Sequence, residues 1–92
     1  MSIANERIDI LFAHAKRAAA NGEFDRSREY VRLARRIAER NRCGLSRAFR
    51  RFTCGRCDVA LRPGVNARVR VRDGRVVIRC DCGATHRYPY TD

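Results

Sequence analysis

Along the first forty residues, apolar side chains recur among polar ones with the period of an amphipathic helix. Apolar side chains recur at i, i+3, i+4 and i+7 in two successive runs. The pattern predicts helices at about 4–20 and about 23–41, and Asn21-Gly22 between them tolerates the left-handed backbone with which helices often end. So short a connection predicts an antiparallel helical hairpin with facing apolar stripes.

The apolar stripe of this hairpin needs a further surface, because two helices alone bury little. We expect it to pack against the rest of the chain or against a partner protein. The candidate residues for such a contact are Ile8, Leu11, Phe12, Ala15, Leu33 and Ile37.

The long helical period is lost after residue 42. We interpret 43–52 as a linker with one helical turn around Ser46–Phe49, between a helical hairpin at 1–42 and a ribbon at 53–92, all within one compact unit. The linker contains Arg50 and Arg51, which are candidates for contact with a phosphate backbone or, alternatively, are simply solvated.

Beyond residue 66, alternating segments flank Asp73-Gly74, which is a strong signal for a two-residue β-hairpin turn. This turn fixes the register, because Arg72 must face Arg75 and each earlier residue pairs with a later one. Paired residues share a face. One face therefore carries Val69, Val71, Val76 and Ile78, and the other carries Arg68, Arg70, Arg72, Arg75 and Arg79 together with Val77.

Like charges directly opposite one another destabilise a hairpin, so an arginine face is not explained by stability. Its natural complement is a polyphosphate. The alternative is a solvated face that happens to be basic.

Two close cysteine pairs, Cys54-x-x-Cys57 and Cys80-x-Cys82, predict one structural zinc ion held by four thiolates. The second pair is one residue shorter than usual, so His86 or, less plausibly, Asp81 remains an alternative fourth ligand. Cys43 lies outside the ribbon and is a weaker candidate. Four thiolates would leave no open position for a catalytic water.

The amino-acid composition indicates what kind of partner the chain binds. The chain has 92 residues and a net charge of +11, from 21 basic residues against 10 acidic ones, and all but one of the basic residues are arginine. Arginine binds phosphate through a planar bidentate fork, so we expect a nucleic-acid partner, with anionic membranes and acidic proteins as weaker alternatives. Grouped carboxylates for general acid–base catalysis are absent, which disfavours a self-sufficient hydrolase.

Apolar segments and cysteine usage indicate the cellular compartment. No apolar run follows Met1, and no stretch approaches the roughly 20 apolar residues of a membrane span. Five cysteines, an odd number of which four lie in close pairs, suit a metal in a reducing compartment better than disulfides. We therefore expect a cytoplasmic protein without membrane contact.

Two segments of the ribbon have a more specific pattern: Pro-Gly-Val-Asn-Ala-Arg-Val-Arg at 63–70 and Arg-Tyr-Pro-Tyr at 87–90. With the helical half, they resemble the family of archaeal ribonuclease P protein component 4, which includes the yeast Rpr2 and Snm1 subunits. Family members carry two residues between the cysteines of the second pair, where this chain has only Asp81.

The resemblance implies an α+β fold of helical hairpin, linker and three-stranded zinc ribbon. It also implies a noncatalytic RNA-binding subunit of an RNA-based endonuclease that removes the 5′ leader of precursor tRNA. Its implied partners are the specificity domain of the catalytic RNA, ribonuclease P protein component 1 with the other protein subunits, and precursor tRNA indirectly. The remaining alternative is a zinc-ribbon binding module of the ribosomal or transcription machinery.

The candidate RNA-binding residues combine the arginine face with neighbouring positions. Tyr88 and Tyr90 either contact ribose or bases or pack in the core of the ribbon. The arginine candidates are Arg68, Arg70, Arg72, Arg75, Arg79, Arg50, Arg51 and Arg87.

Overall fold

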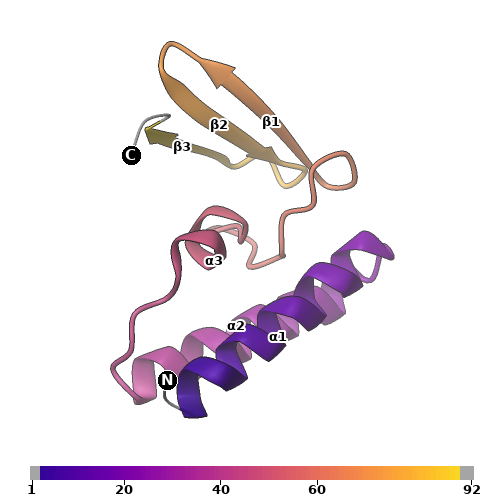
Figure 1. Cartoon of the computed structure of the whole chain (residues 1–92). Coiled ribbons are helices and arrows are strands. Elements are labelled where there is room, and N and C mark those ends of the chain that lie inside the picture. The colour runs from indigo at the N-terminus through magenta and orange to yellow at the C-terminus, as the bar shows by residue number, and fades with distance from the viewer. Residues whose placement is uncertain (1–2, 90–92) are drawn as a thin grey trace.

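The computed structural model describes residues 3–89, which form a helical half and a sheet half (Figure 1). The elements in chain order are α1 (Ile3–Ala20), α2 (Phe24–Arg40), α3 (Arg47–Arg51), β1 (Ala67–Arg72), β2 (Arg75–Cys80) and β3 (Thr85–Pro89). The predicted α+β class is therefore confirmed. No helix in this part of the chain is long and apolar enough to cross a membrane.

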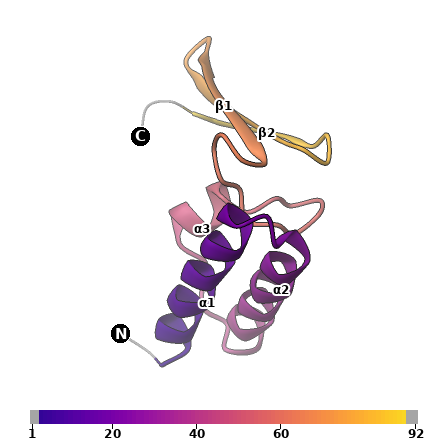
Figure 2. The same ribbon diagram turned by 90° about the vertical axis from the view of Figure 1, so that its right-hand side faces the viewer.

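Helices α1 and α2 form the predicted antiparallel hairpin and lie side by side in both views (Figures 1 and 2). Their bounds agree with the prediction to within one residue at each end. Gly22 has φ +78°, which ends the connection without the strain that a side chain would cause. The core between them consists of Ile8, Phe12, Ala15, Ala19, Val31, Ala34 and Ala38.

The predicted helical turn in the linker is confirmed as α3, which lies between the helical hairpin and the sheet in both views. The Ser46 hydroxyl caps the helix by accepting a hydrogen bond from the Phe49 N–H at 3.1 Å. Phe49 is only 1% exposed, and its ring centroid lies 5.0 Å from that of Phe12. This segment is thus packed against α1 and is not a loose connection.

The three strands form one antiparallel sheet in the order β1-β2-β3. The predicted register is confirmed at every pair from Arg72 and Arg75 back to Arg68 and Arg79. Asp73 and Gly74 have φ of 53° and 73°, as a type I′ turn requires.

A second core lies beneath the sheet and consists of Cys54, Val59, Leu61, Ala67, Ile78 and Cys80. Phe24 and Phe52 contact both cores and so join the two halves. The predicted apolar face of the hairpin is only partly covered: Ile78 is buried, but Val69 and Val71 are 41% and 60% exposed. Burial therefore decreases toward the tip of the β1–β2 hairpin.

Candidate metal centre and arginine surface

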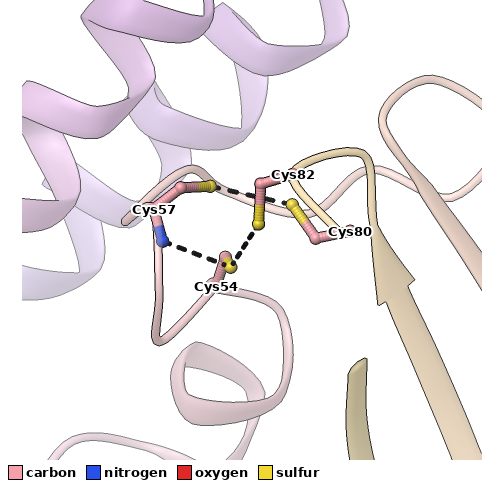
Figure 3. Close-up of side chains that lie close together, drawn as sticks. All are labelled: Cys54, Cys57, Cys80 and Cys82. Atoms are coloured by element: carbon pink, nitrogen blue, oxygen red, sulfur yellow. Dashed lines mark hydrogen bonds between the residues drawn. The ribbon is translucent and has the colours of Figure 1, made fainter. Parts of the chain in front are cut away.

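The four cysteines of the two pairs converge on one point (Figure 3). Cys54 and Cys57 lie in the turn that follows α3, Cys80 is the last residue of β2, and Cys82 lies in the turn before β3. All four sulfur atoms lie within 4.8 Å of one another. The Cys54 and Cys82 sulfurs are 3.6 Å apart, and those of Cys57 and Cys80 are 3.7 Å apart.

These distances fit a tetrahedral metal ion. Metal–sulfur bonds of about 2.3 Å from a tetrahedral centre place the sulfur atoms about 3.8 Å apart. The short Cys80-x-Cys82 pair satisfies this geometry because its two sulfurs approach different members of the first pair. The cluster can therefore hold one metal ion with four thiolate ligands.

Burial and backbone N–H groups set the proton affinity of the thiols. Burial raises the pKa of Cys54 and of Cys80 above the usual value for a thiol. The backbone N–H of Ala84, opposed by partial burial, lowers the pKa of Cys82 to about 7. The N–H groups of Arg56 and Cys57 point at the Cys54 sulfur at 3.4 Å each, an arrangement that stabilises a thiolate.

The other potential ligands lie outside the cluster. Among residues 3–89, the four cysteines form the one group of His, Cys, Asp or Glu side chains close enough to share an ion. Nε2 of His86 is buried without a hydrogen-bond partner in the same range. Its ring instead packs near Gly55, where an added Cβ would lie 3.7 Å from Cε1 of the histidine.

Three arginines of α2 attach the cysteine turn to the helical hairpin, and sequence reasoning missed this role. Arg28 Nε donates to the Cys57 carbonyl at 3.1 Å. Arg32 pairs with the Asp58 carboxylate at 2.8 Å, and Arg35 pairs with its other oxygen. The spacing i, i+4, i+7 places all three on one face of α2, but nothing local to the helix indicates their targets 23–29 residues away.

Ser27 and Asn66 provide the buried polar contacts of this region. The Ser27 hydroxyl donates to the Ala15 carbonyl at 2.9 Å and accepts from the Ala60 N–H at 3.0 Å. The Asn66 side chain donates to the Ala60 carbonyl and accepts from the Arg62 N–H. These bonds fix the chain between the metal centre and β1.

The exposed side of the sheet is the arginine face, which we define as Arg68, Arg70, Arg72, Arg75, Arg79 and Arg87. They surround Val77 and an open hollow of about 560 Å³, also lined by Asp73 and Thr85. Within residues 3–89, none of these six side chains makes a hydrogen bond or an ion pair. Their guanidinium groups are thus available to a ligand.

The arginines of α3 lie apart from this face. The Arg51 guanidinium stacks over the Tyr88 ring at 5.3 Å, and the Tyr88 hydroxyl donates to the Arg50 carbonyl at 3.1 Å. Tyr88 therefore has a packing role between β3 and α3, whereas Tyr90 lies outside the described residues.

Half of the candidate partner-facing residues are buried in the helical core and do not reach the surface. Ile8, Phe12 and Ala15 are buried in the helical core, because Val31 and Ala34 of α2 and Phe49 of α3 cover them. The remaining three are half-buried or exposed: Leu11, Ile37 and Leu33.

A helical hairpin tied to a ribbon with four converging cysteines and a basic sheet defines a small ribbon protein whose cysteine site can hold a metal ion. Residues 7–83 match a family described as the RNase P Rpr2/Rpp21/SNM1 subunit domain. The chain belongs to this family.

Two relatives match this chain over nearly its full length. Ribonuclease P protein component 4 of Halobacterium salinarum is 66% identical over 90 residues, which cover 98% of this chain and 97% of the relative. The component 4 protein of Methanocaldococcus jannaschii is 46% identical over 91 residues and covers 95% and 71%.

Two solved structures are similar to the whole fold. A chain in a cryo-EM structure of archaeal ribonuclease P with mature tRNA superposes with a TM-score of 0.88 at 45% identity, covering 95% of this chain and 76% of that one. The structure of Pfu Rpp21 has a TM-score of 0.67 at 37% identity and covers 95% and 99%.

Proposed function

We propose that the chain is a noncatalytic RNA-binding subunit of cytoplasmic ribonuclease P and supports removal of the 5′ leader of precursor tRNA by the catalytic RNA. The observation that carries this proposal is the arginine face of a chain belonging to the ribonuclease P subunit family. Six neighbouring guanidinium groups repel one another, which destabilises the folded chain unless a polyanion neutralises their charge.

The metal centre would have a structural role in this function. Four cysteines are the ligand set of structural zinc, so Cys54, Cys57, Cys80 and Cys82 would hold one zinc ion and keep the sheet in place. The ion supplies folding free energy, and the charge and hydrogen bonds that meet the RNA come from the protein.

The protein partner would contact the helical half. Leu11, Leu33 and Ile37 are the predicted partner-facing residues that reach the surface, and Ile10, the residue before Leu11, is 57% exposed. They form the candidate surface for ribonuclease P protein component 1 and the other subunits. The arginine face would remain free for the specificity domain of the RNA.

Reconstitution of the particle tests the proposal. Replacing Arg70 and Arg72 by Gln should weaken binding of the catalytic RNA, flatten the salt dependence of binding by up to about one log–log unit per arginine, and slow precursor tRNA cleavage at limiting protein. The matched control is Arg7→Gln with Arg36→Gln, which removes the same charge from exposed positions of the helices. Parent-like affinity, salt slope and cleavage in the first variant would remove the arginine face from the RNA contact.

A further inference from the structure

Among residues 3–89, the arginine face has cations but no aromatic ring. Along β3, His86 pairs with Ile78 and Tyr88 pairs with Val76, so both rings lie on the opposite side of the sheet from Val77 and Arg87. Proteins that bind single-stranded RNA stack its bases on aromatic side chains. In the described part of the chain, this face provides no ring on which a base could stack.

The six guanidinium groups are arranged around a centre. Arg70 and Arg87 flank Val77 in the middle row of the sheet. On either side of this row, Arg68 pairs with Arg79, and Arg72 pairs with Arg75. Alternate residues of one strand are about 6.6 Å apart, and β1 and β3 are about 9.6 Å apart across β2. The charges therefore surround a broad hollow that one extended chain of phosphates would not fill.

The shape and charge of this hollow are complementary to a convex, negatively charged ridge. In double-helical RNA the bases are paired inside, the major groove is too narrow for side chains, and proteins meet phosphates and 2′-hydroxyls. The planar fork of arginine can bind such phosphates through two hydrogen bonds. Thr85, at the edge of the hollow, adds a hydroxyl that can bond to the sugar-phosphate chain.

We infer that the arginine face binds the backbone of double-helical RNA and does not read its bases. This inference rests on the proposed function, because it specifies which form of RNA the same surface takes. The sheet is then a clamp for a helical stem, and its affinity depends on salt and on duplex shape, with little dependence on sequence.

Binding measurements on the full, metal-loaded chain separate the two forms of RNA. The probes are an RNA duplex of about 16 base pairs, a second duplex of scrambled sequence and an oligouridine of equal length, which cannot pair. The variants are Arg70→Gln with Arg87→Gln, on either side of Val77, and the control pair Arg7→Gln with Arg36→Gln. Each is measured at several salt concentrations, after circular dichroism has shown the fold to be intact.

We expect the parent chain to bind both duplexes equally and about tenfold or more tighter than oligouridine. Loss of Arg70 and Arg87 should lower the affinity for duplex about tenfold and flatten its log–log salt slope by up to about 1.8 units. The control pair should leave this slope nearly unchanged. This result would support the inference.

Two other results would overturn it, and they are distinguishable. If oligouridine binds as tightly as duplex and the arginine variant weakens both, the preference for duplex is wrong but the RNA contact stands. If the variant binds both probes with the affinity and slope of the parent, the arginine face is not an RNA contact, and the inference fails together with the proposed role of this face.

Discussion

At the scale of single residues, Ser27 joins three segments through one hydroxyl. Its oxygen accepts a hydrogen bond from the Ala60 N–H, and its O–H donates a hydrogen bond to the Ala15 carbonyl. All three residues are completely buried. A serine inside a helix is a poor helix former, so its presence here is explained by these two bonds.

Ser27→Ala should therefore destabilise the protein by about 1–3 kcal/mol, because a buried N–H loses its acceptor. Urea unfolding measures the change, and metal content should stay at the parent value. Glu29→Ala on the exposed side of the same helix is the control and should cost less than about 0.5 kcal/mol. Equal stability of Ser27→Ala and the parent would contradict the stabilising role of these two hydrogen bonds.

The identity of the fourth metal ligand is a second question at this scale. Because His86 lies outside the group of four sulfurs, His86→Ala should leave the metal content of the purified protein unchanged, whereas Cys82→Ser should lower it. Elemental analysis of both variants decides the matter. Loss of metal in His86→Ala with retention in Cys82→Ser would reverse the assignment.

At the scale of elements, what could be predicted was local in the chain. The β1–β2 register follows from Asp73-Gly74 and the alternation beside it, and the two helices follow from their apolar period. The docking of Arg28, Arg32 and Arg35 on the cysteine turn could not be predicted, because it depends on how α2 lies against residues that are distant in sequence. The same is true of Phe49, whose burial depends on its contact with α1.

The docking contact itself can be tested. Asp58→Asn should loosen the cysteine turn from α2, because Arg32 and Arg35 share its carboxylate and its side chain is only 25% exposed. We expect faster metal loss to a chelator, followed with a colorimetric indicator, while the helical signal in circular dichroism changes little. Asp9→Asn is the control, since Asp9 is exposed on α1 and makes no ion pair among residues 3–89. Equal rates in the two variants would contradict the role of Asp58.

At the scale of the whole molecule, the two cores depend differently on the metal. The helical core is mostly built by α1 and α2, whereas the core beneath the sheet contains Cys54 and Cys80 themselves. A structural metal contributes on the order of 10 kcal/mol to folding, more than so small a core can replace.

The purified protein should contain one zinc ion, and Cys57→Ser should abolish the sheet but keep much of the helical signal. Elemental analysis and circular dichroism measure the two effects. Part of the helical signal should also be lost, because Ala60 and Phe24 connect the helices to the ribbon. If protein purified without a chelator contains no stoichiometric metal, the prediction of a four-cysteine metal site is wrong.

The crowding of unpaired cations on the arginine face has a consequence for how the subunit behaves alone. Dissolved salt screens their mutual repulsion, so the free protein should melt at a higher temperature as ionic strength rises. The same salt should weaken the proposed binding of RNA. Stability and affinity should thus respond to salt in opposite directions, and a bound RNA should stabilise the folded chain most where salt is scarce. In the proposed function, the RNA would act as the counterion that the isolated sheet lacks, and the subunit would reach its full stability only after assembly.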